Sequence, residues 1–240
     1  MTLPFYKETQ HEKVVFKSAF SCQLPILLKG PTGCGKSRFV EAMAAELDLK
    51  VITVSCNDET SATDLLGRYL IIGGETIWQD GPATKAVKEG SILYLDEIAE
   101  AREDVITILH SLSDHRRELF IDRLGESYKA NNSFGLVVSF NPGYQKSLKE
   151  MKPSTRQRFV SLAFTYPEAS VEVEILINET QVSPKEALKL VKYANKIRSM
   201  SELGLVETVS TRLLVNASKL IVNGMQARLA WDLAIVEALS

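Results

Sequence analysis

Eight consecutive residues near the start of the chain have the types and spacing of a phosphate-binding loop. They fit the pattern G-x-x-x-x-G-K-[ST] at every fixed position and are Gly30, Pro31, Thr32, Gly33, Cys34, Gly35, Lys36 and Ser37. Glycines let backbone N–H groups curl around phosphate oxygens, while the lysine pairs with the β- and γ-phosphates and the serine binds Mg²⁺. A chance glycine-rich turn is the alternative, but an apolar run precedes the loop and a helical pattern follows it. We therefore predict that this loop, with Arg38, binds ATP and that Lys36 acts in catalysis.

A pair of acidic residues follows the apolar run ILYL at residues 92–95. A carboxylate at the end of a buried strand can hold Mg²⁺, which is the role predicted for Asp96 together with Ser37. Glu97 comes one residue later, where it can orient or deprotonate the attacking water. The alternative is that the pair only caps the next helix. Its position downstream of a phosphate-binding loop favours the catalytic role.

A polar amide, Asn141, ends the apolar run at residues 136–140. If this strand lies beside the others, the amide would reach the γ-phosphate or the attacking water. Asn141-Pro142-Gly143 can also be read as a simple turn. The neighbouring motifs favour the role of a sensor.

Three arginines are candidates for contacts with phosphate charge. Arg156 and Arg158 lie in the segment PSTRQRF at residues 153–159. Each could be an ordinary surface arginine, or one could reach into a neighbouring subunit as an arginine finger. Arg212 falls in the first turn of a predicted helix, where a cation is unfavourable to the helix dipole. An anion is therefore expected opposite it, and a nucleotide phosphate is the natural candidate.

Apolar runs alternate with helical patterns from about residue 24 to residue 160, which predicts an α/β fold with a parallel sheet flanked by helices. The predicted strands are residues 24–28, 51–54, 92–95 and 136–140, and the first helix is 38–47. After Tyr166-Pro167 only helical patterns remain. Ser183 and Glu186 form a capping-box pattern, and Ser210 can cap a helix that ends near Gly224. We predict a large nucleotide-binding domain over residues 1–165 and a small helical lid over 166–240.

Two predicted β-hairpins interrupt this alternation. One joins residues 68–72 to 75–79 through Gly73-Gly74, and the other joins 118–121 to 126–129,. The pattern leaves open whether they decorate the edge of the sheet or form separate inserts. Tyr69 and Trp78 on the first hairpin are either packing residues or exposed aromatics that grip a substrate.

The composition excludes several classes of protein. With 28 Lys+Arg and 30 Asp+Glu the net charge is −2, which argues against non-specific nucleic-acid binding. Three cysteines without a CxxC pair suggest neither a disulfide framework nor a zinc site, and they suit a reducing compartment. No run approaches the roughly 20 apolar residues of a membrane helix, and the start lacks a signal-peptide pattern. We expect a cytoplasmic protein without a membrane segment.

Taken together, these motifs resemble the MoxR branch of AAA+ ATPases over essentially the whole chain, and the CbbQ/NorQ/NirQ subfamily in particular. The segments that carry the resemblance are GPTGCGKS, GRYLIIGGETIWQDGP, LDE, SDHRRELFIDRLGE, FNPGYQ and KPSTRQRF, in the family's order. The resemblance implies that both hairpins are inserts facing a pore or a partner. It assigns the Walker A, Walker B, first-sensor and second-sensor roles to Lys36, Ser37, Asp96, Glu97, Asn141 and Arg212. It places the finger at Arg156 or Arg158, of which we favour Arg158.

The subfamily resemblance also implies a homohexameric ring that works with a partner carrying a von Willebrand factor A domain. CbbQ-like members, with CbbO, reactivate inhibited Rubisco, whereas NorQ-like members, with NorD, mature or activate nitric oxide reductase. Both groups share every motif quoted above. We expect the CbbQ-like role, with Rubisco as the client and an association with carboxysomes, and keep the NorQ-like role as the alternative.

Three other classes of P-loop protein fit less well. Asp122-Arg-Leu-Gly125 has the D-x-x-G spacing of a switch GTPase, but it lies in a hairpin turn and no N-K-x-D segment follows. The helical lid and the arginines expected to act in a neighbouring subunit argue against a small-molecule kinase. A DNA-remodelling ATPase is disfavoured by the net charge.

Overall fold

The computed structural model describes residues 4–141, 151–200 and 208–239, and the predicted turn at Pro142-Gly143 lies outside them. The chain forms two compact units. Unit 1 comprises Met1–His11, Gly30–Phe39 and Phe164–Ser240, and unit 2 comprises Glu12–Lys29 and Val40–Ala163. The phosphate-binding loop thus groups with the C-terminal helices, and a domain boundary between residues 165 and 166 remains a prediction.

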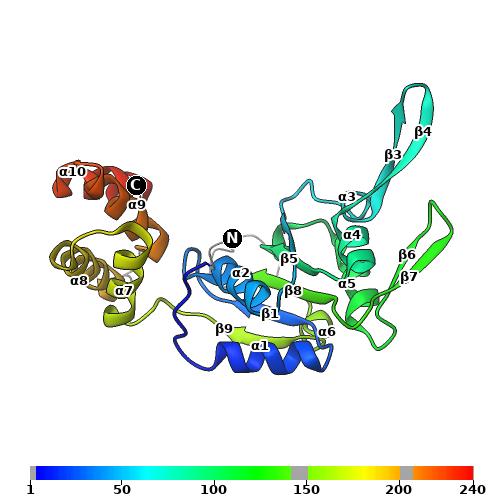
Figure 1. Cartoon of the computed structure of the whole chain (residues 1–240), viewed down its shortest axis with the longest axis horizontal. Helices are drawn as coiled ribbons and strands as arrows, with labels where there is room; N and C mark the ends of the chain where they lie inside the picture. Colours follow the sequence, from blue (N-terminus) through cyan, green and yellow to red (C-terminus); the bar gives the residue numbers. More distant parts are fainter. Residues whose placement is uncertain (1–3, 142–150, 201–207, 240) are drawn as a thin grey trace. The chain divides into compact units, whose positions relative to one another are not determined.

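Unit 2 is built on a five-stranded sheet (Figure 1). The strands are β1 (Ile26–Lys29), β2 (Val51–Ser55), β5 (Ile92–Asp96), β8 (Gly135–Phe140) and β9 (Val160–Ala163). They lie in the order β2-β5-β8-β1-β9, and every pairing is parallel. The predicted parallel α/β sheet is confirmed. Strand β9, which pairs with β1 at one edge, was not predicted, and β2 at the other edge is only partly buried.

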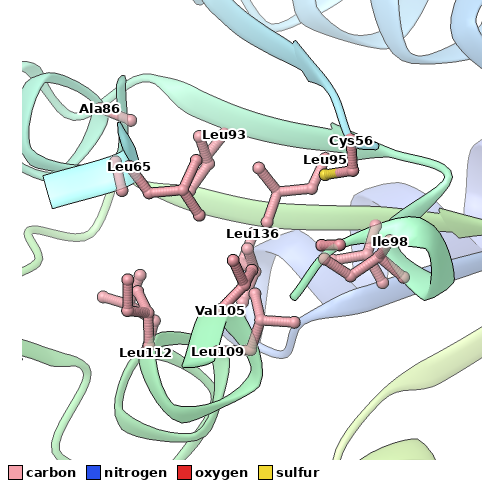
Figure 2. Packing of buried hydrophobic residues seen from close by; sticks show 14 of the residues in the cluster. Cys56, Leu65, Ala86, Leu93, Leu95, Ile98, Val105, Leu109, Leu112 and Leu136 are labelled. Carbon is pink, nitrogen blue, oxygen red and sulfur yellow. The ribbon is translucent and has the colours of Figure 1, made fainter. Parts of the chain in front are cut away.

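Helices cover this sheet and enclose an apolar core. The helices of unit 2 are α1 (Glu12–Ser21), α3 (Ala62–Leu66), α4 (Pro82–Glu89), the 3-10 helix η1 (Ile98–Glu100), α5 (Glu103–Ser113) and α6 (Pro153–Arg156), while α2 (Lys36–Glu46) spans both units. Figure 2 shows Leu93 and Leu136 of the sheet facing Val105, Leu109 and Leu112 of α5. All five side chains are almost completely buried. Burial of this apolar surface holds β5 and β8, the strands that carry the polar residues described below, in fixed positions.

Both hairpins are confirmed, and each is a separate two-stranded sheet rather than an edge of the main sheet. The first consists of β3 (Gly67–Ile72) and β4 (Glu75–Asp80), and the second of β6 (Glu118–Ile121) and β7 (Glu126–Lys129). The first hairpin is inserted between α3 and α4. Its two ends are joined at Leu66, whose carbonyl accepts hydrogen bonds from Gly81 N at 2.9 Å and Thr84 Oγ1 at 2.6 Å.

The C-terminal part of unit 1 is helical. Its helices are α7 (Ala169–Thr180), α8 (Pro184–Met200), α9 (Thr211–Val222), α10 (Ala227–Trp231), the π-helical turn η3 (Asp232–Val236) and α11 (Glu237–Leu239). Ser183 caps α8, since its Oγ accepts from Glu186 N at 3.3 Å, and the same hydroxyl donates to Glu186 Oε2 at 2.8 Å. Ser210 caps α9 by accepting from Leu213 N at 3.3 Å. None of the helices in the described ranges is long and apolar enough to cross a membrane.

Candidate nucleotide site

The phosphate-binding loop lies between β1 and α2, and two of its glycines have conformations that other residues rarely adopt. Gly33 has a φ of +71° and Gly35 a φ of +101°,. A Cβ at Gly33 would also lie only 2.7 Å from both Cβ and Oγ of Ser210, whereas a Cβ at Gly35 would meet no atom within 4 Å. The backbone conformation alone therefore requires glycine at position 35. At position 33 the close approach of the α9 N-cap adds a second reason.

The lysine of the loop is held over the loop's own carbonyl groups. Lys36 Nζ donates to Gly30 O at 2.8 Å and to Pro31 O at 2.9 Å, and the residue is 6% exposed. These contacts fix the ammonium group at the loop, where a phosphate would be bound. Ser37 is half-buried, whereas Arg38 is exposed and pairs with Glu179 at 2.9 Å.

Unit 1 brings Arg212 to the same loop. A Cβ at Gly33 would lie 3.1 Å from Cβ of Arg212, which is in the first turn of α9. Burial raises the pKa of the neighbouring Cys34 thiol, and the positive charges of Lys36 and Arg212 oppose that rise. Two cations therefore act on this part of the loop, as an anion-binding site requires.

In unit 2 the acidic pair is organised by two hydroxyl groups. Tyr94 OH donates to Asp96 Oδ1 at 2.8 Å, and Ser139 Oγ on the neighbouring strand β8 donates to the same oxygen. Ser139 Oγ in turn accepts from Glu97 N at 2.9 Å. One fully buried serine thus fixes the carboxylate of Asp96 and the backbone of Glu97. Ser139 was not predicted as a site residue, although it is the only polar side chain within β8.

Glu97 is held in an uncommon conformation and contacts the predicted sensor. Its φ of 56° lies in the left-handed region. For a residue other than glycine this conformation is unfavourable by about 1 kcal/mol. Asn141 Nδ2 donates to Glu97 Oε1 at 3.0 Å. The structure therefore brings together Asp96, Glu97 and Asn141, three residues that the sequence assigned to one catalytic group.

A cysteine lies beside this acidic pair. Cys56 N donates to Asp96 O at 2.9 Å. Burial raises the pKa of the Cys56 thiol to about 12, and the negative charges of Asp96 and Glu97 add to the rise. The thiol therefore stays neutral at physiological pH and adds no third negative charge to the acidic pair.

The sheet places the ends of three adjacent strands at one edge, because parallel strands point in the same direction. Asp96 ends β5, Asn141 follows β8, and the phosphate-binding loop follows β1 in the chain. Lys29, the last residue of β1, is in register with Phe140, the residue before Asn141. Ligands of open α/β sheets bind at this carboxyl edge.

The predicted arginine-finger segment lies at α6. Arg158 is exposed and Arg156 is half-buried. Phe159, which directly precedes β9 in the chain, is buried. The fully buried Thr155 anchors the segment to α5 through a 2.9 Å hydrogen bond to Nε2 of His110. Burial lowers the pKa of His110, and the positive charges of Arg158 and Lys152 lower it further. His110 is therefore a neutral structural residue.

Magnesium, the usual companion of ATP, fits the predicted oxygen ligands. Mg²⁺ at nucleotide sites is bound by one or two protein oxygens together with phosphates and water. Ser37 in unit 1 offers a hydroxyl and Asp96 in unit 2 a carboxylate of this kind, and their joint role in holding the ion remains a prediction. Within the ranges that the structure describes, no group of three or more His, Cys, Asp or Glu side chains could form an all-protein metal site.

Known proteins identify the family. Residues 25–159 match the family model "AAA domain (dynein-related subfamily)", and residues 172–240 match "CbbQ/NirQ/NorQ C-terminal". The chain is 52% identical to the denitrification regulatory protein NirQ of Pseudomonas aeruginosa, covering 99% of this chain and 91% of that protein. It is 53% identical to NorQ of Paracoccus denitrificans, covering 99% and 88%, and 46% identical to CbbQ of Hydrogenophilus thermoluteolus, covering 97% and 87%.

A solved structure supports the fold. The crystal structure of a protein from Cytophaga hutchinsonii aligns with a TM-score of 0.58 at 18% identity, covering 89% of this chain and 74% of that one. Of the three curated relatives above, NirQ and NorQ are more similar to this chain than CbbQ is. This order favours the NorQ-like alternative over the CbbQ-like expectation. The chain belongs to the CbbQ/NirQ/NorQ family of AAA-domain ATPases.

Proposed function

We propose that this ATPase remodels a protein client in denitrification and that the client is nitric oxide reductase. The observation that carries the proposal is the identity of 52% to NirQ and 53% to NorQ over 99% of the chain, against 46% to CbbQ. In this role the chain forms a homohexameric ring and works with a NorD-like partner that carries a von Willebrand factor A domain.

Each of the predicted site residues has its own role in ATP hydrolysis. Lys36 binds the β- and γ-phosphates, and Ser37 and Asp96 would hold Mg²⁺, which would neutralise phosphate charge. Glu97 orients the attacking water and accepts its proton, while Asn141 fixes the Glu97 carboxylate through their 3.0 Å hydrogen bond,. Arg212 contacts the phosphates from the lid. Arg158 of the neighbouring subunit stabilises charge in the transition state, a role that its exposure permits,.

Reconstitution with the client tests this proposal. Nitric oxide reductase isolated without its accessory proteins is incubated with this chain, the NorD-like partner and ATP with Mg²⁺, and nitric oxide consumption is followed. We expect activity to rise with the unsubstituted chain and to stay at the starting level with Lys36→Ala, because that variant lacks the phosphate-binding ammonium. A rise that is equal with Lys36→Ala would contradict an ATP-driven role.

The first hairpin is the surface best suited to contact the client or partner. Ile71 is 80% exposed, Ile72 56% and Ile77 44%. Tyr69 and Trp78 contact each other edge-to-face at 5.0 Å, and Tyr69 OH donates to Arg123 O of the second hairpin at 3.3 Å. The aromatic pair therefore packs within and between the hairpins, and the most exposed apolar side chains are aliphatic. Exposed apolar groups on a two-stranded ribbon are typical of an interaction surface.

Replacing these isoleucines should uncouple hydrolysis from the client. Threonine keeps the β-branched shape that a strand favours but removes apolar surface. We expect Ile71→Thr with Ile72→Thr to reduce client-stimulated ATP hydrolysis by about 10-fold, a size typical of losing a contact worth about 1.4 kcal/mol, and basal hydrolysis far less. The measurement is phosphate release with and without client and partner. Val14→Thr, on α1 and 67% exposed, is the matched control. An equal loss in the control would contradict a specific role of the hairpin.

The second candidate function is reactivation of inhibited Rubisco with a CbbO-like partner. Its support is the 46% identity to CbbQ over 97% of the chain. The same reconstitution with inhibited Rubisco as the client distinguishes this function from the activation of nitric oxide reductase.

A further inference from the structure

A buried ion pair ties together three helices of unit 1. Glu172 of α7 is fully buried, and both of its carboxylate oxygens are used. Oε2 accepts from Arg198 Nη1 at 2.8 Å, while Oε1 accepts from Arg198 Nη2 at 2.8 Å and from Thr211 Oγ1 at 2.6 Å. Arg198 belongs to α8 and Thr211 to α9. Because apolar residues of similar volume often stabilise a protein as well as a buried ion pair does, such a pair calls for a reason beyond stability, and fixed geometry is one.

The geometry that this pair fixes is the start of α9. Besides the contact to Thr211, Arg198 Nε donates to Val209 O at 2.7 Å. Val209 and Thr211 flank the N-cap Ser210, and Arg212 follows directly. The pair therefore holds the backbone on both sides of the N-cap, one residue before the arginine that approaches the phosphate-binding loop.

The same guanidinium group also reaches the loop through an aromatic ring. Arg198 Cζ lies 4.3 Å from the ring centroid of Tyr166, within the range of a cation–π contact,. Tyr166 OH donates to Thr32 O at 3.2 Å. The next loop residue, Gly33, lies against Ser210. Thr32 and Gly33 are adjacent in the loop, and they contact Tyr166 and Ser210. Arg198 contacts the ring of Tyr166 and the carbonyl of Val209, the residue before Ser210.

We propose that Glu172 and Arg198 are positioning residues for Arg212, which set the first turn of α9 against the phosphate-binding loop and so determine how well Arg212 acts on bound ATP. This inference rests on the proposed role of Arg212 in hydrolysis. It extends the nucleotide site to three side chains, those of Glu172, Arg198 and Thr211, which are joined to one another by hydrogen bonds.

Substitutions that keep the charge or the size test the inference. Arg198→Lys keeps the cation but loses the paired fork and the bond to Val209, and Thr211→Val removes one hydroxyl group at constant volume. We expect Arg198→Lys to lower kcat by about 10-fold or more, since small misplacements in a catalytic group have effects of this size, and to change KM for ATP less. Thr211→Val should show a smaller loss in the same direction, and Thr211→Ser should restore it.

A double-mutant cycle shows whether the pair acts through Arg212. In an Arg212→Ala background, Arg198→Lys and Thr211→Val should cause no further loss of kcat. Losses that multiply with that of Arg212→Ala would overturn the inference, as would an unchanged kcat in Arg198→Lys and Thr211→Val. The thermal midpoint of each variant is measured to check that it folds. If Arg198→Lys does not fold, Thr211→Val still tests the inference.

A control variant on α7 shows whether a loss of kcat is specific to the buried pair. Glu174→Gln, on the same helix and in an exposed ion pair with Lys7, should leave kcat within about 2-fold because surface pairs contribute little,. Normal hydrolysis in Arg212→Ala would reject the role of Arg212 and this inference with it. The client would still be tested independently by Lys36→Ala in the reconstitution.

Discussion

Glu97→Gln is expected to bind ATP as the unsubstituted chain does but to hydrolyse it at least about 100-fold more slowly, because general-base catalysis contributes 10²–10⁴-fold. The amide has the same shape as the carboxylate but cannot accept the proton of the attacking water. Asn141 Nδ2 and Ser139 Oγ, which contact the Glu97 side chain and backbone, remain in place. Single-turnover phosphate release and binding of a fluorescent ATP analogue measure the two effects separately.

The matched control for this variant is Glu100→Gln. Glu100 is an exposed carboxylate three residues further along the chain, at the end of η1, so its substitution changes the same charge close by. Its hydrolysis rate should stay within about 2-fold, as surface substitutions away from a functional group usually have small effects. Equal turnover in Glu97→Gln and the unsubstituted chain would remove Glu97 from the proposed mechanism.

Arg158→Ala is expected to lower hydrolysis by about 1000-fold, the lower end of the range for arginine fingers. The side chain is exposed in the single chain, and its segment is anchored by the buried Thr155 and Phe159. An exposed arginine on an anchored segment can reach a neighbouring subunit without a cost to its own fold. Steady-state phosphate release by assembled protein is the measurement.

Mixed rings reveal whether this arginine acts on a neighbour. Arg158→Ala subunits keep Glu97, and Glu97→Gln subunits keep Arg158, so some interfaces in a mixture have both groups. For random mixing at equal amounts, about a quarter of the head-to-tail interfaces are complete, and activity should recover to about that fraction. Arg156→Ala, tested in the same way, separates the two arginines. No recovery with either variant would contradict a finger that acts between subunits.

The elements that the sequence predicted well have strong local signals. The phosphate-binding loop has fixed residue types, and the hairpins have alternating patterns around Gly73-Gly74 and Gly125 that appear in the structure with the expected turns. The helix starts at Ser183 and Ser210 followed from side chains that bond to nearby backbone groups. In each case the residues that decide the structure lie within a few positions of one another.

The features that the sequence did not predict depend on contacts between distant segments. Strand β9 has only four residues and is defined by its pairing with β1, more than 130 positions earlier,. Ser139 was missed because its partners, Asp96 and Glu97, lie on another strand. The ion pair of Glu172 and Arg198 joins α7 to α8. The spacing of apolar residues in these two helices does not predict this pair.

The motifs do not distinguish the two expected clients. The motifs that indicated the family lie in the ATP-hydrolysing machinery and in the hairpins, and they are the same for both expected clients. The expectation of a CbbQ-like role had no residue of its own to support it. Similarity over nearly the full length of the chain, which is higher to NirQ and NorQ than to CbbQ, favours the NorQ-like role instead.

The most direct test of the account compares both clients in parallel. Inactive nitric oxide reductase and inhibited Rubisco are each incubated with this chain, ATP with Mg²⁺ and the matching NorD-like or CbbO-like partner, and the recovered activity is measured. We predict ATP-dependent recovery of nitric oxide reductase that is lost in Lys36→Ala, and no recovery of Rubisco. Recovery of Rubisco without recovery of nitric oxide reductase would contradict the proposed client and leave the ATPase assignment intact.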